Sequence, residues 1–193
     1  MVARLVLVRH GETEWSKSGQ HTGRTDIPLT DRGRDEALHV RDRLAGWTFA
    51  RVLSSPLSRA LDTARLAGFG DDVETAEDLL EWDYGEYEGL TTADIRASRP
   101  RWSLWADGAP GGESAADVGT RVDGLLKELR DLEDDSLLFA HGHLLRVLAA
   151  RWLGLTPADG RLFALDPATI SILGYERETS VIDLWNSPCG EAS

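Results

Sequence analysis

Short apolar runs alternate along the chain with longer segments in which apolar positions recur at helical spacing. This alternation is typical of an α/β fold with a largely parallel sheet covered by helices. The apolar runs predict strands at residues 4–8, 51–54, 137–140, 169–174 and 180–185. We expect residues 1–193 to form a single domain, because a chain of this length suits one hydrophobic core.

Signals for helices fall between the predicted strands. Thr30 is suited to be an N-cap, and apolar residues follow it at helical spacing up to Leu44. A second helix is predicted with Ser55 as its N-cap and Pro56 at its first position, where a missing N–H is tolerated.

Two further helices are predicted in the second half of the chain. The longer one begins near Ser114 and ends near the acidic residues 133–135, which would oppose its dipole. The other covers residues 144–153. Residues 81–112 show no clear period, and we interpret them as an irregular, lid-like insertion with at most one helix.

The candidate chemistry lies where the predicted strands end. Two of them lead into a histidine followed by a glycine, at His10 and His141, and a third strand leads into the helix that carries Arg59. Arg9 directly precedes the first histidine. Because ligands bind at the carboxyl edge of open α/β sheets, we expect these four side chains to converge on one small anion. Arginine matches phosphoryl oxygens, and a neutral histidine nitrogen can attack phosphorus, so the pattern indicates phosphoryl transfer.

The net charge of the chain limits the classes of ligand or partner that such a site can bind. The chain has 33 acidic and 21 basic side chains and a formal net charge of −12. This balance argues against a nucleic-acid or anionic-membrane surface, since both require a basic field. A small phosphorylated metabolite remains compatible, because arginines can line a cleft locally. No metal or other cofactor is required if Arg9, Arg59 and His141 neutralise the phosphoryl charge.

Composition also bears on location and assembly. No apolar stretch approaches the roughly 20 residues that cross a bilayer, and no secretory signal is recognisable at the start. Cys189 is the only cysteine, which excludes an intramolecular disulfide, so we expect a cytoplasmic protein. The residues leave both a monomer and a homodimer open.

The motifs around these residues resemble those of the histidine phosphatase superfamily, the phosphoglycerate mutase-like enzymes. Five blocks follow one another in the family's order: Arg9-His10-Gly11-Glu12-Thr13, Ser54-Ser55-Pro56-Leu57-Ser58-Arg59-Ala60, Glu81-Trp82-Asp83-Tyr84-Gly85-Glu86-Tyr87-Glu88-Gly89, Pro110-Gly111-Gly112-Glu113-Ser114 and His141-Gly142. The resemblance covers most of the chain. It implies a three-layer α/β/α sandwich with a mostly parallel central sheet.

The resemblance also implies roles for the site residues. His10 would be the nucleophile that becomes phosphorylated, and Glu81 would give a proton to the leaving oxygen and take one from water. Arg9, Arg59 and His141 would hold the phosphoryl oxygens. The other residues expected to contact phosphate or substrate are Ser16, which replaces the family's usual asparagine, Thr22, Gly23 and Gly142.

Departures from the motifs favour a phosphatase within this family. Gly142 follows His141 where the acid phosphatase and phytase branch has an aspartate, and Trp82 stands where the mutases have an arginine. The adjacent arginine pair of the mutases is also missing after Trp105. The third block looks like that of a group with sugar bisphosphatases and broad-specificity acid-type phosphatases. We therefore expect hydrolysis of small phosphomonoesters, with sugar phosphates or bisphosphates as candidates, through a phosphohistidine.

Two alternative functions remain: a cofactor-dependent phosphoglycerate mutase, and a phosphate-binding sensor without turnover. The complete set of His10, Arg59, Glu81 and His141 argues against the sensor, since binding alone needs no proton donor. Asp83, Glu86 and Glu88 compete with Glu81 for the role of proton donor, and we favour Glu81.

Several aromatic and histidine side chains keep two interpretations each. His143 suggests a metal chelate with His141, or a polar supporting role, which we favour because no further ligand spacing is visible. Trp102 and Trp105 would either wall the pocket or pack the core of the insertion. His21 is expected in a loop near the cleft.

Overall fold

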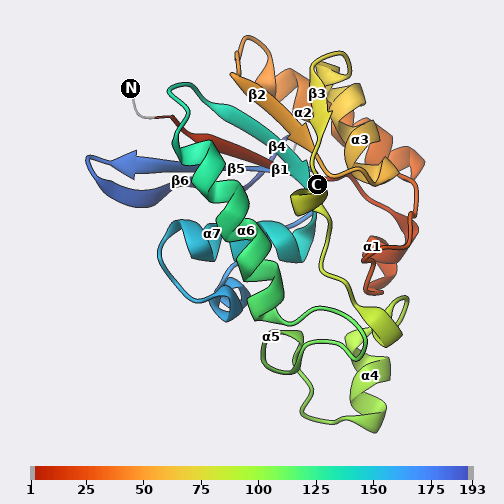
Figure 1. Cartoon of the computed structure of the whole chain (residues 1–193). Helices are drawn as coiled ribbons and strands as arrows, with labels where there is room; N and C mark the ends of the chain where they lie inside the picture. Colours follow the sequence, from red (N-terminus) through yellow and green to blue (C-terminus); the bar gives the residue numbers. More distant parts are fainter. Residues whose placement is uncertain (1–2, 191–193) are drawn as a thin grey trace.

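The computed structural model describes residues 3–190 and contains one six-stranded sheet with helices on both faces (Figure 1). The strand order is β3-β2-β4-β1-β5-β6, with parallel pairing from β3 to β1 and antiparallel pairing of β5 with β1 and of β6 with β5. This arrangement confirms the predicted α/β fold with a mostly parallel sheet. The strands are β1 Leu5–Arg9, β2 Arg51–Ser54, β3 Val73–Thr75, β4 Ser136–Ala140, β5 Thr169–Glu176 and β6 Thr179–Pro188.

Helices connect the parallel strands and fill the two outer layers. The α-helices are α1 Glu14–Ser18, α2 Asp31–Leu44, α3 Ser58–Ala64, α4 Thr92–Ser98, α5 Leu104–Asp107, α6 Ala115–Arg130 and α7 Gly142–Trp152. Short 3-10 helices occur at Glu77–Leu79, Gly85–Tyr87 and Pro157–Leu162, and a π-helical turn at Arg65–Phe69. Among the described residues, no helix is both long and apolar enough to cross a membrane.

The side chains of β1 alternate between two apolar clusters, as the two-residue period of a strand requires. Leu5 and Leu7 pack with the buried faces of α6 and α7. Val6 and Val8 face the other way and pack with α2 and α3. All four are almost fully buried, so β1 is covered on both faces and ends deep inside the molecule.

The boundaries of α6 show which signals in the sequence were decisive. Ser114 caps the helix in a capping box with Asp117, as the predicted start requires. The helix ends at Arg130, a few residues before the predicted end at 133–135. Lys127 and Arg130 in its last turn stabilise the carboxyl end, and the acidic residues fall outside the helix.

The predicted start of the second helix was wrong. Helix α3 begins at Ser58, after Leu57 as N-cap, and not at Pro56. The reason is that the hydroxyl of Ser55 contacts His141 at 2.7 Å, while the carboxylate of Asp26 accepts the N–H of Ser58 at 2.9 Å. A residue from a distant loop therefore supplies the cap.

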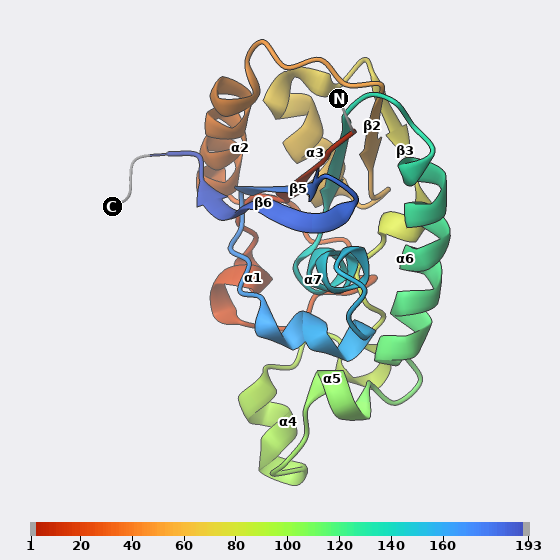
Figure 2. The same cartoon turned by 90° about the vertical axis from the view of Figure 1, so that its left-hand side faces the viewer.

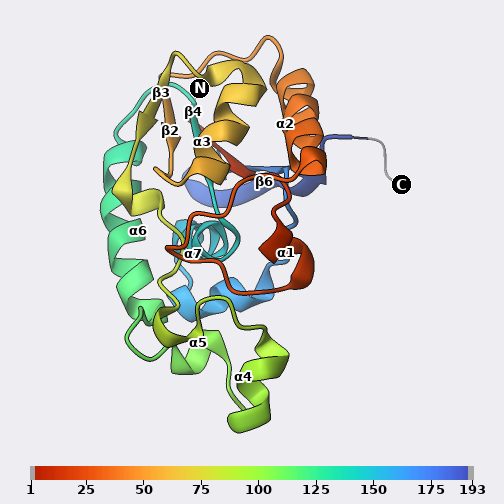
Figure 3. The ribbon, with the colours of Figure 1, turned by 90° about the vertical axis from the view of Figure 1, so that its right-hand side faces the viewer.

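The insertion at 81–112 is more regular than expected, with two α-helices, α4 and α5. A capping box of Thr91 and Asp94 begins α4. In Figures 2 and 3, α4 and α5 form the lower end of the molecule, below α1 and α7. Helix α1 itself was not predicted, although Thr13 and Ser16 form a capping box there too.

A close backbone crossing fixes the turn that follows β1. A Cβ atom on Gly11 would lie 2.3 Å from the carbonyl oxygen of Gly33, and a Cβ on Gly33 would lie 2.2 Å from that of Glu12. Real Cβ atoms do not approach backbone this closely, so both positions need glycine. The first turn of α2 thereby sets the position of the chain directly after His10.

Replacing Gly33 with alanine should lower both stability and activity. The new methyl group has to push the backbone of Glu12 away, and we expect a loss of roughly 1–3 kcal/mol in the free energy of unfolding. Gly124→Ala is the matched control, since it lies inside α6 with nothing within 4 Å of its Cβ position. It should raise stability by up to about 1 kcal/mol. Urea unfolding of both variants tests this, and an unchanged Gly33→Ala would contradict the crossing.

Candidate active site

His10 directly follows β1, and its ring is held in one tautomer. The backbone N–H of His10 donates to the carbonyl of Ala140 in β4, which continues the parallel pairing by one residue. Nδ1 lies 2.8 Å from the carbonyl oxygen of Gly11. Because a carbonyl only accepts, Nδ1 carries the proton and Nε2 keeps its lone pair. Nε2 is therefore the ring nitrogen that is free to act as a nucleophile.

Arg9 places a second group at the same strand end. Its Nη1 donates to the carbonyl of Leu165, and its guanidinium packs beside Gly142, where an added Cβ would lie 3.3 Å from Cζ. Its Nε is buried without a hydrogen-bond partner among the described residues. Burying an unpaired donor costs free energy, so this N–H is suited to donate a hydrogen bond to an anionic oxygen.

Arg59 is fully buried at the start of α3 and is held by one loop. Nη2 donates to the carbonyls of Thr22 and Gly23, at 3.2 and 2.9 Å, and Nη1 donates to that of Thr25 at 3.0 Å. Nε donates to Nδ1 of His141 at 3.2 Å. Four of its five N–H groups thus have protein acceptors.

His141 caps α7 at the end of β4, and both of its ring nitrogens are occupied. Nδ1 accepts from Arg59, so the proton lies on Nε2, which donates to the hydroxyl of Ser55 at 2.7 Å. The rings of His10 and His141 lie 5.1 Å apart, centroid to centroid, edge to face. The two histidines therefore meet at one strand edge, although 131 residues separate them in sequence.

The carboxylate of Glu81 faces the same point from the insertion. Its Oε1 accepts the N–H groups of Trp82 and Leu144, at 2.8 and 2.9 Å, and its Oε2 accepts that of His143 at 3.0 Å. Two of these donors belong to the first turn of α7, where the helix dipole favours an anion. Asp83 and Glu86 do not line the cavity. Asp83 accepts the N–H group of Gly85, and Glu86 is exposed to solvent.

A cavity of about 260 Å³ opens over these groups. Of the predicted site residues, it is lined by Arg9, His10, Ser16, Thr22, Glu81 and Gly142. Arg59, His141 and Gly23 are not among the residues that line it: Arg59 and His141 are fully buried, and Gly23 belongs to the loop that holds Arg59. The structure therefore brings the predicted residues together, with six at the wall of the cavity and three buried.

The hydroxyl of Ser16 is committed to local structure. It accepts the N–H of Thr13 at 2.9 Å and donates to the carbonyl of Thr13 at 3.0 Å, which caps α1. The hydroxyl of Thr22 donates to the carbonyl of Gln20 at 3.1 Å. Both residues face the cavity, yet neither hydroxyl is a free donor as it stands.

Several lining residues were not assigned to the site from the sequence. They include Gln20, Tyr84, Thr92, His143, Arg146 and Leu165. Tyr84 lies 2.6 Å from Nδ1 of His143 through its hydroxyl, which agrees with a supporting role for His143. Arg146 lies one helical turn after His143 in α7, and this spacing was the signal available in the sequence. His21 lines the cavity, as expected for a loop residue near the cleft.

Trp102 and Trp105 of the insertion pack the core and do not line the cavity. Trp102 is 3% exposed, and its indole N–H donates to the carbonyl of Gly108 at 2.9 Å. Trp105 packs against Trp82 and carries the guanidinium of Arg146 over its ring at 4.7 Å. Both therefore support the site from behind.

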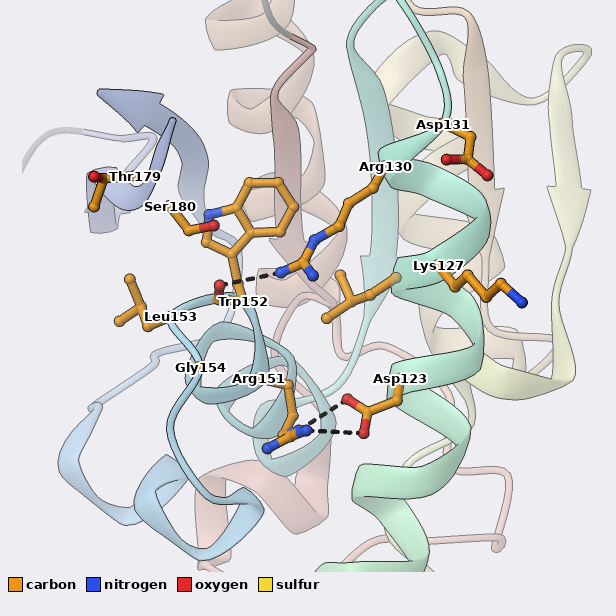
Figure 4. A pocket seen from close by; sticks show the side chains of 11 residues that line it. Asp123, Lys127, Arg130, Asp131, Arg151, Trp152, Leu153, Gly154, Thr179 and Ser180 are labelled. Carbon is orange, nitrogen blue, oxygen red and sulfur yellow. Dashed lines mark hydrogen bonds and ion pairs between the residues drawn. The ribbon is translucent and has the colours of Figure 1, made fainter. Parts of the chain in front are cut away.

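A larger hollow of about 710 Å³ lies elsewhere, between α6, the end of α7 and the start of β6 (Figure 4). Its arginines are already engaged: Arg151 pairs with Asp123 at 2.8 and 3.0 Å, and Arg130 donates to the carbonyl of Trp152 at 3.1 Å. Neither histidine nor cysteine occurs among the described residues that line it. Size therefore does not identify the active site, whereas the chemistry of the smaller cavity does.

Burial controls the protonation of the histidines in and around this cavity. It is the largest cause that lowers the pKa of His10 well below its usual value, followed by the positive charges of Arg59 and Arg9. Burial likewise lowers the pKa values of His141 and His143, assisted by nearby arginines. Neutral rings agree with the tautomers that the hydrogen bonds require. No cluster of three metal-ligating side chains occurs within residues 3–190.

Comparison with known proteins agrees with this site. The model of the histidine phosphatase superfamily (branch 1) matches residues 5–188. An acid phosphatase of Mycobacterium tuberculosis is 44% identical, with 96% of this chain and 94% of that protein covered. A sedoheptulose 1,7-bisphosphatase of Saccharomyces cerevisiae is 36% identical, over 80% of this chain and 69% of the yeast protein.

Solved structures show the same fold. The product of the open reading frame Rv3214 of Mycobacterium tuberculosis superimposes with a TM-score of 0.93 and 41% identity, covering 98% of this chain and all of that one. A mycobacterial glucosyl-3-phosphoglycerate phosphatase, in complex with VO3, gives a TM-score of 0.85 at 31% identity, with 96% and 99% covered. The predicted resemblance and the predicted fold are confirmed.

Stability should fall as the pH is lowered below neutrality. In the unfolded chain His10, His141 and His143 bind protons near pH 6.5, whereas their lowered pKa values keep them neutral in the folded protein. Below about pH 6.5 the unfolded state binds more protons, so each histidine removes up to about 1.4 kcal/mol of stability per pH unit until its folded pKa is reached.

Urea unfolding at pH 7.5, 6.5 and 5.5 measures this loss. His143→Gln should reduce the slope of stability against pH by up to about one quarter, since burial also lowers the pKa of His21 and four histidines contribute. His39→Gln is the control, because His39 is exposed on α2 and should leave the slope unchanged. Stability that stays constant over this range would contradict the neutral state of the three rings.

Proposed function

The chain belongs to the histidine phosphatase superfamily (branch 1) and is a phosphoric monoester hydrolase, and we propose that it acts on small phosphorylated metabolites through a phosphohistidine at His10. The observation that carries the proposal is the free Nε2 of His10 beside Arg9, Arg59 and His141. The hydrogen bond from Nδ1 to Gly11 leaves that lone pair available, and Arg9 and Arg59 add positive charge around it. A phosphoryl group needs both features at once.

The reaction then takes two displacements at phosphorus. In the first, Nε2 of His10 forms the bond to phosphorus, the ester P–O bond breaks, and Glu81 in its protonated form gives its proton to the leaving oxygen. In the second, water attacks the phosphohistidine, the Glu81 carboxylate takes its proton and is protonated again, the P–N bond breaks, and phosphate leaves. Arg9 holds phosphoryl oxygens through its unpaired Nε, while the buried Arg59 and His141 add charge and polarity beside His10.

Substrate size and charge follow from the cavity. About 260 Å³ suits a phosphoryl group with a short organic part, and the lining hydroxyl, amide and imidazole groups suit a hydroxylated one. Relatives named as acting on sugar phosphates support this class: the sedoheptulose 1,7-bisphosphatase and a glucosyl-3-phosphoglycerate phosphatase of Mycolicibacterium vanbaalenii, which is 37% identical over 82% of this chain and 77% of its own length. We propose a sugar phosphate or bisphosphate as substrate.

The mutase remains the second candidate, because relatives at 36% identity include a 2,3-bisphosphoglycerate-dependent phosphoglycerate mutase of Gloeobacter violaceus. Trp82, at the position after the catalytic glutamate, argues for hydrolysis. It is fully buried and donates its indole N–H to the carbonyl of Glu113, so it provides no cation to the cavity.

We also propose that catalysis needs no metal and that the protein is cytoplasmic. The arginines neutralise phosphoryl charge, and the one cysteine cannot form an intramolecular disulfide. With a net charge of −12, neither nucleic acid nor an anionic membrane is expected as a partner.

His10→Ala should abolish phosphate release from a generic aryl phosphate such as p-nitrophenyl phosphate. Without Nε2 there is no acceptor for the phosphoryl group, and we expect a loss of at least about 10³-fold in kcat/KM. His39→Ala, on the exposed face of α2, serves as the control and should keep full activity. Circular dichroism checks that the fold is intact. Appreciable turnover by folded His10→Ala would reject the nucleophile.

Activity should persist in excess EDTA and without added 2,3-bisphosphoglycerate. A phosphate-release screen over sugar mono- and bisphosphates, run beside a phosphoglycerate mutase assay, measures both requirements. Dependence on a divalent cation would indicate a metal mechanism, and dependence on the bisphosphate together with isomerised product would indicate the mutase. Binding without turnover of any ester would support the sensor.

A further inference from the structure

Arg59 and the carboxylate of Glu88 hold opposite sides of one loop, residues 22–25. Arg59 donates to the carbonyl oxygens of this loop, as described above. Glu88 Oε1 accepts two N–H groups of the same loop, from Gly23 at 2.8 Å and from Thr25 at 3.1 Å. The loop therefore presents its acceptors to the cation and its donors to the anion.

Gly23 lies at the closest point of this contact. A Cβ atom there would meet Glu88 Oε2 at 2.7 Å and the carbonyl oxygen of Trp82 at 2.6 Å. Gly23 is buried, so the carboxylate of Glu88 reaches it only because no side chain intervenes. This packing gives Gly23 a role in the site that does not require contact with substrate.

Neighbouring backbone pairs join the same two segments. His21 donates its N–H to the carbonyl of Leu90 and accepts from Gly89, both at 2.9 Å, and Gln20 forms a β-bridge with Thr91. Glu88 thus ends a short antiparallel pairing between the loop after α1 and the insertion. Beyond this backbone pairing, the Glu88 side chain joins the two segments by accepting the N–H groups of Gly23 and Thr25.

We propose that Glu88 is a positioning residue for the phosphatase reaction: it fixes loop 22–25, whose carbonyls hold Arg59 against His141 and beside His10. The proposal rests on the function proposed above, because it assumes that His10 attacks phosphorus. Glu88 does not line the cavity and so does not touch substrate. Its effect passes through hydrogen bonds to the loop and from the loop to Arg59.

The test compares Glu88→Ala with Glu86→Ala, both in the turn that follows Tyr84. Glu86 is exposed and its carboxylate has no hydrogen bond within the described part of the chain, so Glu86→Ala should keep wild-type kcat/KM. Glu88→Ala frees two N–H groups of the loop, and we expect kcat/KM for p-nitrophenyl phosphate to fall roughly ten- to hundredfold. Glu88→Gln keeps an oxygen acceptor and should stay within about threefold of wild type.

The pH profile separates positioning from general destabilisation. The acid limb of kcat/KM reports the protonation of His10, which burial, the charge of Arg59 from α3 and the charge of Arg9 from β1 oppose; the neutral ring of His141 lies beside it at the start of α7. When loop 22–25 is released, Arg59 moves away while Arg9 and His141 remain. The acid limb of Glu88→Ala should therefore move to higher pH. A loss of activity through partial unfolding would lower the rate at every pH without this shift.

If Glu88→Ala does not fold, Glu88→Asp supplies the same measurement, since it keeps the charge but falls one methylene short of the loop. Equal kcat/KM for the Glu88 and Glu86 variants, or a loss with an unmoved acid limb, would overturn the proposal. His10→Ala is assayed beside them. Activity that survives in His10→Ala rejects the phosphohistidine itself, whereas inactive His10→Ala with fully active Glu88→Ala rejects only the positioning role.

Discussion

A guanidinium that is removed from water needs an acceptor for nearly every N–H group, and the site depends on how Arg59 meets this need. Three backbone carbonyls and one imidazole nitrogen satisfy it, and the guanidinium itself is fully buried. The same hydrogen bonds tie loop 22–25 to α3 and fix the tautomer of His141. Burial lowers the pKa of His10 most, and the positive charges of Arg59 and Arg9 lower it further. One buried cation therefore links the conformation of the loop to the protonation of both histidines.

The second organising feature is the set of N–H groups at the start of α7. Two of them orient Glu81, and the glycine at the first position leaves room for the guanidinium of Arg9. The motif His141-Gly142-His143 therefore does three things in three successive residues: it contacts Arg59, admits Arg9 and supports Tyr84. Three successive residues can do this because the N-terminus of a helix already has unpaired N–H groups that bind an anion.

The elements with strong local signals could be predicted from the sequence. Short continuous apolar runs identified β1 and β4, and the capping residues Thr30 and Ser114 identified the starts of α2 and α6. The start of α3 could not, since its cap is a carboxylate of a remote loop, Asp26. Local propensity carries no information about a partner that folding brings from thirty residues away.

The composition of the candidate site could be predicted, but the hydrogen bonds that position its residues could not. His10 and His141 were expected to meet, and they do. Nothing in the sequence around Arg59 indicates that carbonyl groups of loop 22–25 hold its guanidinium. Glu88 was considered only as a competitor of Glu81. No one-dimensional pattern distinguishes a carboxylate that binds backbone N–H groups from a solvated one.

The contact between Gly11 and Gly33 also divides the chain into parts that tolerate change and parts that do not. Insertions within the segment that carries α4 and α5 lengthen a loop whose ends are already anchored, at a small cost in entropy. A side chain at either glycine displaces the nucleophile itself. Descendants of this sequence can therefore acquire new substrates by remodelling the rim of the cavity, while the chemistry at its base is inherited unaltered.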